Sequence, residues 1–498
     1  DYEKVMPVHL SILPNGYVNT SVSVDDIKDF GGYAVVFDLG KYGRRLGTSF
    51  AYSMKPSLVK MQYPKQSLDY LGVDFLNRVG VQSIRYGIPF VSPDNPDYQG
   101  FRQELKKLMK DFMDNNITVM LMFGEGRMAQ SMPLGTTRPH LDENGKFLHT
   151  KQDLVWLPEL DEDFKKFVKE LCLDFGWPKG PVTAVCLWNE PWEGTSISGW
   201  QADMIRYKEI YTKMAEAVIE AREKDIDVLV GGGDSNSNAL DKFFADGKMD
   251  MLPIFDFLSI HYQGMEAPVL YPEWNKRKDN KGRVKIWDTE SWVGNTDDRV
   301  GLVIAANRSA GYDRSMGIFG GYMYSGDPNR SVRSMEVRTE KGKETMPKLH
   351  NTWSAAAAVG AAQSMIGERE FNRLLFKNGL PWVMVFDGYE NKKDDGTIVI
   401  AGDLGEAFGA ENILFRNVRS LSEARKKVDL HHQLKTLPAN SAERKKIENE
   451  LNTYYPITDG KMILKANSSF LLYDFYGNAI APKNGIYEIP LNYQGYYM

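Results

Sequence analysis

The feature that most constrains the fold is an alternation of two kinds of segment between about residues 46 and 365. Short apolar runs rich in β-branched residues alternate with longer segments whose apolar residues recur at helical spacing, which is typical of repeated strand and helix units. Strands that are apolar throughout, with helices between them, predict a parallel sheet covered by helices. Eight strand-like runs occur: GTSFAYS from Gly47, VQSIRYGI from Val81, ITVMLMFG from Ile117, VTAVCLWNE from Val182, DVLVGGG from Asp227, DFLSIHYQ from Asp256, VKIWDTES from Val284 and MGIFGGYMYS from Met316.

Eight such units predict an α/β fold, a (β/α)8 TIM barrel over residues 46–367. Helical segments follow several of the strands, for example FRQELKKLMKDFMDN from Phe101 and QADMIRYKEIYTKMAEAVIEAREK from Gln201. A doubly wound open sheet is the alternative architecture. Its dinucleotide-binding form has no support, because no G-x-G-x-x-G motif follows the first strand.

The rest of the chain predicts smaller β structures around this barrel. Residues 368–498 contain short alternating strands with turns and are expected to form a C-terminal β-sandwich accessory domain. Within it, a strongly charged stretch at about 420–455 predicts a helical insertion with a solvated face, which a capping box of Asn440 and Glu443 could begin. Residues 1–45 contain strand-like segments that we expect to join the sandwich, since the termini of domains often lie close together.

Charge and composition exclude several classes of partner. The chain has 61 basic and 66 acidic residues, a formal net charge of -5, which argues against nucleic acid binding. No apolar run reaches the roughly 18 residues of a membrane span, so the protein is expected to be soluble without one. The two cysteines, Cys172 and Cys186, lie in apolar runs and are expected to be buried free thiols. Nothing in the sequence points to an oligomeric state.

The beginning of the chain and its sequons bear on the cellular compartment. The sequence starts at Asp1 without an apolar signal core, as a mature chain does after a targeting segment is removed. A secreted, periplasmic or cell-surface location is therefore expected. Sequon-like triplets begin at Asn19, Asn307, Asn329 and Asn467, but such triplets are frequent by chance and do not establish glycosylation.

Two glutamates close predicted barrel strands, where chemically active groups of such barrels are found. Glu190 ends the fourth strand, in WNEP, and Glu290 ends the seventh. Each follows a strongly apolar run, where an acid is costly to bury without a compensating role. Strands four and seven lie on opposed walls of one barrel mouth, so the two carboxyl groups can face each other. A gap of about 5 Å predicts a retaining glycosidase, and one of about 6.5 to 9.5 Å an inverting one.

The surroundings of the two glutamates suggest different roles. Glu190 is flanked by Trp188, Pro191 and Trp192, and such an apolar setting favours the protonated form that a general acid needs. Glu290 can be held ionised by donors, for which Arg85 on strand two and Tyr262 at the end of strand six are candidates. A purely structural ion pair is the alternative for Arg85.

Taken together, W-N-E-P on strand four, an acid on strand seven, Arg85 on strand two and S-I-H-Y on strand six resemble the glycoside hydrolases of clan A. The resemblance covers residues 46 to about 365. It implies that Glu190 is the acid/base, Glu290 the nucleophile and Asn189 the partner of the sugar 2-hydroxyl. It also implies that Arg85 and Tyr262 orient Glu290 and that His261 lines the catalytic subsite.

Several aromatic residues are candidates for stacking on sugar rings, which present apolar C–H faces. Trp192 and Trp292 follow strands four and seven and are candidate substrate contacts, whereas Trp287, inside a strand, is expected to be packing. Many clan members carry a Trp after strand eight. Here GGYMYSGD offers Tyr322 and Tyr324 instead.

Two further features of the sequence bear on the chemistry. Asp288 shares the strand face of Glu290 by period-two alternation and could support it, although an ordinary strand residue is the favoured interpretation. No metal or other cofactor is expected, because His431 and His432 are adjacent and no H-x-x-x-H or Cys/His cluster occurs. A serine hydrolase is disfavoured because G-x-S-x-G is absent.

The sequence thus predicts a retaining, endo-acting glycoside hydrolase that cleaves a β-linked oligo- or polysaccharide. Endo action is expected because the loops after strands three and four are long and aromatic, and a neutral β-glucan such as a β-1,3-glucan is the first substrate expectation. A β-galactan or sulfated galactan hydrolase, similar to agarases or porphyranases, is the alternative if the basic loops 275–283 and 329–343 border the cleft. An inactive carbohydrate-binding barrel is a third possibility, which the presence of both glutamates disfavours.

Overall fold

The computed structural model describes a few residues before 27 and, with short internal gaps, most of the following chain. The described ranges are 27–124, 155–191, 200–235, 254–261, 283–290, 298–318, 338–345, 354–388, 396–401, 426–453 and 460–498.

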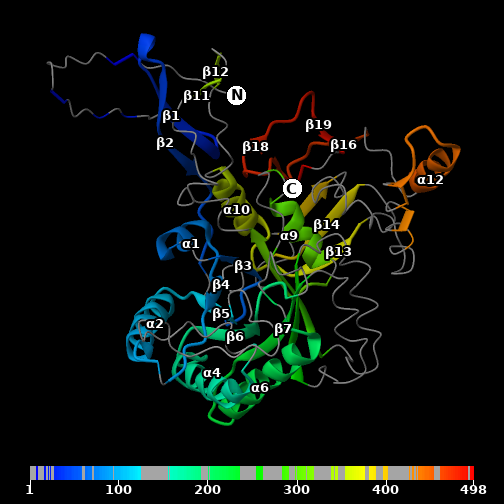
Figure 1. Ribbon diagram of the computed structural model, residues 1–498. Helices are drawn as coiled ribbons and strands as arrows, with labels where there is room; N and C mark the ends of the chain where they lie inside the picture. Colours follow the sequence, from blue (N-terminus) through cyan, green and yellow to red (C-terminus); the bar gives the residue numbers. More distant parts are fainter. Residues whose placement is uncertain are drawn as a thin grey trace.

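The centre of the molecule is a closed barrel of eight parallel strands in the order β10-β3-β4-β5-β6-β7-β8-β9 (Figure 1). This confirms the predicted TIM barrel. Because all the strands run the same way, their carboxyl ends meet at one mouth. The strands are β3 (Gln66–Asp69), β4 (Ser83–Ile88), β5 (Thr118–Phe123), β6 (Val182–Leu187), β7 (Leu229–Ser235), β8 (Phe257–His261), β9 (Lys285–Glu290) and β10 (Arg314–Ile318).

The first barrel strand differs from the prediction. GTSFAYS lies in β2 (Arg44–Tyr52), which pairs antiparallel with β1 (Gly31–Asp38) in a separate two-stranded sheet. The barrel instead closes through β3, whose sequence is only QSLD and which pairs with β4 and β10. The apolar run was the stronger strand signal, whereas β3 is short and polar and is defined by its neighbours. The next six predicted strands are confirmed, and the eighth is confirmed as far as Ile318, with the rest of its run outside the described residues.

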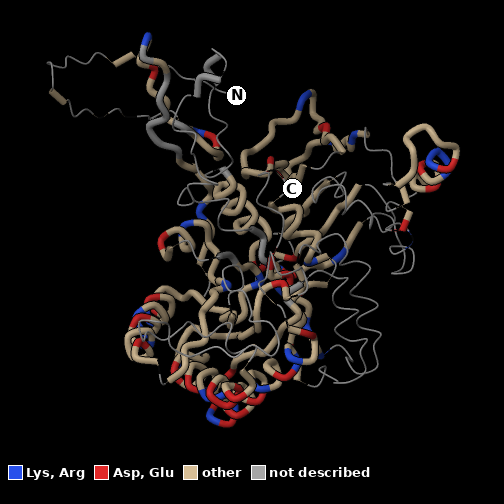
Figure 2. Tube along the Cα trace, in the orientation of Figure 1, with Lys and Arg blue, Asp and Glu red and all other residues tan. Residues whose placement is uncertain are grey.

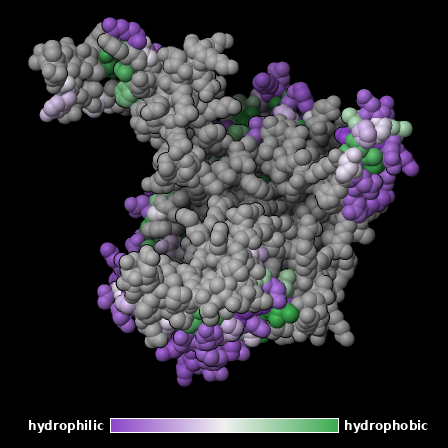
Figure 3. All heavy atoms as spheres, viewed as in Figure 1, coloured by the Kyte–Doolittle hydropathy of each residue, from purple (hydrophilic) through white to green (hydrophobic). Residues whose placement is uncertain are grey.

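Helices cover the outside of the barrel: α1 (Val73–Val79), α2 (Tyr98–Asp114), α4 (Asp161–Phe175), α6 (Met204–Arg222), α9 (Val300–Ser309) and α10 (Ser354–Met365), with the 3-10 helix η2 (Pro158–Leu160) directly before α4. A second 3-10 helix, η1 (Gly40–Tyr42), connects β1 to β2. α4 and α6 pack together, and their outer faces carry the dense charges at the bottom of Figure 2. Lys165 pairs with Glu216 there at 3.0 Å, and Lys169 with Glu220 at 2.7 Å. The same face is hydrophilic in Figure 3.

Alternate residues of the barrel strands enter two separate apolar clusters. The outer cluster joins strands to helices and includes Val119, Leu121, Val185 and Ile260. The inner cluster contains Met120, Met122, Ala184, Cys186, Phe257 and Trp287. Trp287 is 2% exposed and stacks on Phe257, so its predicted role in packing is confirmed. Cys172 and Cys186 are buried free thiols, as predicted.

The C-terminal part is an antiparallel sheet region, drawn in yellow to red in Figure 1. A six-stranded sheet has the order β13-β14-β15-β20-β17-β18, and β16 pairs with β19 in a second sheet. Val383 and Ile400 face the second sheet in one apolar cluster, whereas Met384 and Val399 face the barrel side. The strands are β13 (Phe371–Leu374), β14 (Trp382–Phe386), β15 (Thr397–Ala401), β16 (Lys461–Lys465), β17 (Leu472–Tyr473), β18 (Ala479–Ile480), β19 (Ile486–Pro490) and β20 (Tyr496–Tyr497).

Smaller elements lie outside these two bodies. The predicted helical insertion contains α12 (Ala442–Asn452), whose N-cap is Ser441 rather than Asn440, because the Ser441 hydroxyl accepts from the Arg444 amide. A short hairpin pairs β11 (Arg338–Glu340) with β12 (Lys343–Thr345). Phe30 and Asn478 exchange two hydrogen bonds, which tie the start of β1 to the C-terminal sheet region. The domain boundaries at residues 45 and 367 stay predictions.

Among the described residues, no helix is both long enough and apolar enough to cross a bilayer.

Candidate active site

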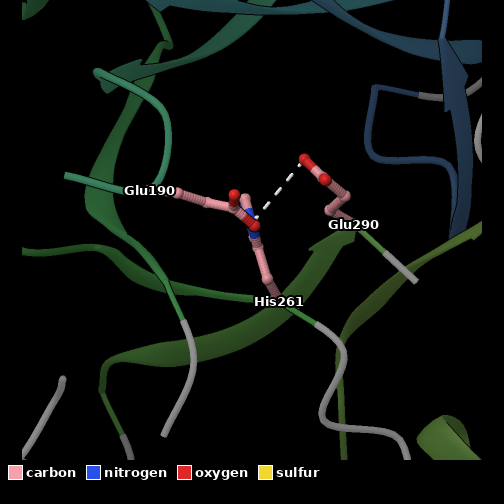
Figure 4. A group of neighbouring side chains, drawn as sticks. All are labelled: Glu190, His261 and Glu290. Atoms are coloured by element: carbon pink, nitrogen blue, oxygen red, sulfur yellow. Dashed lines mark hydrogen bonds and ion pairs between the residues drawn. The ribbon is translucent and has the colours of Figure 1, made fainter. Parts of the chain in front are cut away.

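Four of the predicted site residues meet at the mouth of the barrel. Arg85 lies on β4, Glu190 follows β6, and His261 and Glu290 end β8 and β9. All four are buried, with Arg85 8%, Glu190 5%, Glu290 5% and His261 0% exposed. Figure 4 shows the two glutamate side chains pointing toward each other with His261 between them. Strands that are distant in the sequence therefore deliver these groups to a single point.

The two carboxylates lie close enough to act on one bond. A carboxylate oxygen of Glu190, one of Glu290 and a ring nitrogen of His261 all lie within 4.8 Å of one another. The glutamates therefore face each other as predicted. Paired carboxyl groups about 5 Å apart are the arrangement of retaining glycosidases, since the larger gap of inverting enzymes leaves room for a water molecule.

Arg85 connects the two sides of this site. Its Nη1 donates to Oε2 of Glu290 at 3.0 Å, and its Nη2 donates to Oδ1 of Asn189 at 2.8 Å. Nη2 also lies 2.8 Å from Sδ of Met122 in the inner cluster. A guanidinium and a carboxylate form a charge-assisted hydrogen bond, which is stronger than one between neutral groups. Arg85 thus holds Glu290 and the residue before Glu190 in one hydrogen-bonded unit.

His261 lies between the glutamates as a neutral ring. Its Nδ1 is 2.9 Å from Oε1 of Glu190 and 3.6 Å from Oε2 of Glu290. Complete burial is the main cause that lowers the pKa of His261 to about 3. The charge of Glu290 raises this pKa, and the charge of Arg85 lowers it further. The imidazole is therefore uncharged near neutral pH. Glu190 contacts this neutral ring, whereas Glu290 contacts the Arg85 cation.

The segment after β6 places Glu190 through an unusual backbone. Trp188 has φ 63° and Glu190 has φ 46°, the left-handed region that non-glycine residues rarely adopt. Trp188 is 1% exposed and packs edge-on against Trp200. Trp188 also lies against Gly124 after β5, where a β-carbon would lie 2.3 Å from Cε3 of Trp188. The buried Trp188 ring thus anchors the chain just before Glu190.

The end of β9 places Glu290 by a different device. Ile260 pairs with Asp288 and His261 with Glu290, so β9 has one extra residue, Thr289, opposite a single step of β8. This bulge turns Glu290 into the mouth. Strict alternation had predicted that Asp288 shares the face of Glu290. This prediction is wrong, because the bulge places the two side chains on opposite faces of the sheet. The Asp288 carboxylate points to the helix layer instead, where it accepts from Nδ2 of Asn307 at 2.5 Å.

The three central side chains could also offer ligand atoms to a metal ion, because one donor atom from each lies within 4.8 Å of the others. Arg85 already occupies one oxygen of Glu290 at 3.0 Å. A cation at this position would have to compete with that guanidinium. The arrangement is better matched to two carboxylates that transfer a proton and form a bond themselves.

No family model matches the sequence, and no curated protein matches it either. Solved structures do resemble it. A glycoside hydrolase family 30 subfamily 8 xylanase from Clostridium acetobutylicum has 13% identity and a TM-score of 0.46, with 89% of this chain and 96% of that chain covered. A family 39 β-xylosidase from Caulobacter crescentus has 13% identity and a TM-score of 0.40, with 90% and 97% covered. A family 26 β-mannanase from Bacteroides ovatus has 12% identity and a TM-score of 0.33, with 50% and 78% covered.

These neighbours are glycoside hydrolases, the group of proteins that the sequence motifs also resemble. Because the identities and TM-scores are low, we draw neither a family nor a substrate from them. The functional interpretation rests on the geometry of Arg85, Glu190, His261 and Glu290.

Five predicted contact residues lie outside the described residues: Trp192, Tyr262, Trp292, Tyr322 and Tyr324. Asn189 is described. It is partly buried, and among the described residues its amino group has no hydrogen-bond partner, so it can donate to a ligand hydroxyl.

Sequence reasoning missed the residues behind the site, above all Gly124 and Asn307. Asn307 is completely buried, so its sequon-like triplet is not a glycosylation site in this fold. An Asn within the apolar helix VGLVIAANRS was the available signal for a buried polar contact.

Proposed function

We propose that the protein is a retaining β-glycoside hydrolase, with Glu290 as the nucleophile and Glu190 as the acid/base. The observation that carries this proposal is the pair of facing carboxylates within 4.8 Å at the carboxyl ends of β6 and β9. The separation supports a double displacement, in which one carboxylate reaches the anomeric carbon while the other reaches the glycosidic oxygen.

The chemistry has two steps. An oxygen of Glu290 forms a bond to the anomeric carbon, the glycosidic C–O bond breaks, and Glu190 gives its proton to the departing oxygen. Water then attacks the anomeric carbon of the glycosyl ester, gives a proton to Glu190 and releases Glu290. The configuration of the sugar is retained because each step inverts it once.

The division of roles follows from the contacts of each glutamate. Glu290 is in contact with the Arg85 guanidinium at 3.0 Å, a cation that complements the negative charge of a nucleophilic carboxylate. Glu190 is in contact with the neutral His261 ring at 2.9 Å, and the buried Trp188 precedes it in the chain. The neutral His261 ring and the apolar Trp188 suit the group that must carry a proton in the first step.

For the substrate we propose a β-linked polysaccharide that is cleaved internally, with a β-1,3-glucan first among the candidates. The long segments that follow β5 and β6 in the sequence support internal cleavage; residues 125–154 and 192–199 of these segments lie outside the described residues. A panel of β-1,3-glucan, β-1,4-glucan, β-galactan, sulfated galactan, xylan and mannan, assayed for released reducing ends, tests this choice.

Kinetics of the two glutamate variants test the mechanism. Glu190→Ala should keep substantial activity on an aryl glycoside with an acidic leaving group but lose polysaccharide hydrolysis, because only the poor leaving group needs a proton. Azide should then be captured as a β-glycosyl azide. Glu290→Ala should lose turnover on both substrates by several orders of magnitude, and azide should restore cleavage with an α-glycosyl product.

The stereochemistry of the azide products separates the possible outcomes. A β product from Glu290→Ala together with an α product from Glu190→Ala would reverse the two roles. Full activity in both variants would show that the site is elsewhere.

A further inference from the structure

A buried polar cluster lies directly behind the proposed nucleophile. It consists of Asp288 on β9, Asn307 on α9 and Ser315 on β10, each 0% exposed. Asp288 and Ser315 are paired neighbours on adjacent strands, and α9 packs against β10. We call these three residues the β9–α9 cluster.

The hydrogen bonds of this cluster lead from the helix layer to the backbone of Glu290. The Asn307 amide Nδ2 donates to Oδ2 of Asp288 at 2.5 Å and to the Ser315 hydroxyl at 2.8 Å. The other carboxylate oxygen of Asp288, Oδ1, accepts from the backbone amide of Glu290 at 3.3 Å. The Asp288 carboxylate therefore connects the backbone of Glu290 to Asn307 on α9, and Asn307 in turn donates to Ser315 on β10.

The position of this connection matters because β9 carries a bulge there. A bulge disrupts the regular strand pairing, and the residue that follows it needs another contact to fix its direction. On the inner side, the Thr289 hydroxyl is hydrogen-bonded to Ser259. On the outer side, Asp288 accepts from the amide of Glu290. The bulged segment is thus held from both faces of the sheet.

Burying an aspartate at a strand–helix interface is costly unless it is hydrogen-bonded, and apolar residues fill most of this interface. A leucine or valine would pack α9 against the barrel without this cost. The carboxylate has a use that an apolar residue cannot supply, which is to accept from the amide of the residue that must face the substrate.

Resting on the proposed function, we propose that the β9–α9 cluster is a positioning unit, which sets the angle at which the Glu290 carboxylate meets the anomeric carbon. A displacement of about 1 Å at a reacting group can cost about 100-fold in rate. The cluster touches neither substrate nor reacting atoms, so its effect should appear in the rate of bond formation and not in substrate affinity.

The test measures Asn307→Ala with polysaccharide, with an aryl β-glycoside and with 2,4-dinitrophenyl 2-deoxy-2-fluoro-β-glucoside, a probe that traps the glycosyl ester on the nucleophile. We expect kcat to fall about 10- to 100-fold on both substrates, with KM changed less than about threefold. The rate of trapping, followed by intact-protein mass, should fall by the same factor.

A matched control separates positioning from stability. Gln363 on α10 is a buried amide outside the β9–α9 cluster, and it donates to Glu368 at 3.3 Å. Gln363→Ala should lower the melting temperature and leave kcat and trapping unchanged. A double exchange, Asp288→Asn with Asn307→Asp, keeps one acid and one amide in the cluster and should recover much of the rate that either single change loses.

The outcomes are distinguishable. If Asn307→Ala lowers only the melting temperature, as the control does, the cluster is structural and the inference is overturned. Should Asn307→Ala not fold, Ser315→Ala removes only the hydroxyl beside Asn307 and must show a smaller loss of the same kind, or the inference fails. Glu290→Ala is measured alongside: activity in that variant would overturn the proposed function itself.

Discussion

The two strands that carry the glutamates deliver them by contrasting means. After β6, an apolar ring at Trp188 and a left-handed backbone at Glu190 set the direction of the side chain. At the end of β9, a bulge and buried hydrogen bonds set that of Glu290. The support beside the proposed proton donor is apolar and the one beside the proposed nucleophile is polar, a contrast of environment by which one barrel could give two identical side chains different tasks.

The largest effect should come from the residue that joins the two supports. Arg85→Ala removes both the guanidinium on Glu290 and the donor to Asn189, so we expect kcat to fall about 100- to 1000-fold on polysaccharide and on the aryl glycoside. Arg85→Lys should recover only part of this, because an ammonium cannot bridge both acceptors. If kcat fell only on the polysaccharide, Arg85 would act on Glu190 alone and not on Glu290.

An intermediate effect is expected from Gly124→Ala, which attacks only the support of Glu190. The new β-carbon would lie 2.3 Å from the Trp188 ring, and Gly124 has φ 78°, which alanine adopts with strain. Displacement of Trp188 should reduce polysaccharide hydrolysis roughly tenfold and leave the aryl glycoside nearly unaffected, since the aryl leaving group needs no acid. Equal losses on both substrates would mean that the two supports are not separate.

The last prediction concerns His261, which lies between the supports and should affect stability and its pH dependence. Its folded-state pKa is about 3, against 6.5 when unfolded, so the unfolded chain binds a proton in this range that the folded protein does not. Stability contributed by the neutral ring should therefore be lost as pH falls below 6.5, by up to about 1.4 kcal/mol per pH unit. The free energy of unfolding is measured with urea at several acidic pH values. It should change less steeply with pH in His261→Gln than in the unchanged protein, and the same dependence on pH in both proteins would contradict this.

Much of the barrel and the centre of its mouth could be predicted from the sequence, because apolar strands at regular spacing determine both. Glu190 and Glu290 were found as acids at the ends of such strands. The first barrel strand was not, because QSLD in β3 lacks any apolar pattern and is fixed only by pairing with β4 and β10.

The support of Glu290 could not be predicted for a related reason. Alternation along β9 put Asp288 and Glu290 on one face, and only the register with β8 shows the extra residue that separates them. A bulge is a relation between two strands, so one strand's sequence does not contain it. The N-cap of α12 was displaced by one residue, which is within the usual uncertainty of helix ends.

Helix α9 packs against the barrel on one side and against the C-terminal sheet region on the other. On one side it carries Asn307, and on the other Gly301 lies against the sheet, where a β-carbon would come within 1.8 Å of the Tyr497 hydroxyl oxygen. A truncated chain that ends after the barrel would leave this side of α9 facing water. The sheet region is therefore a poor choice for removal when the catalytic barrel is to be produced or grafted alone, and any fusion partner would have to be attached beyond it.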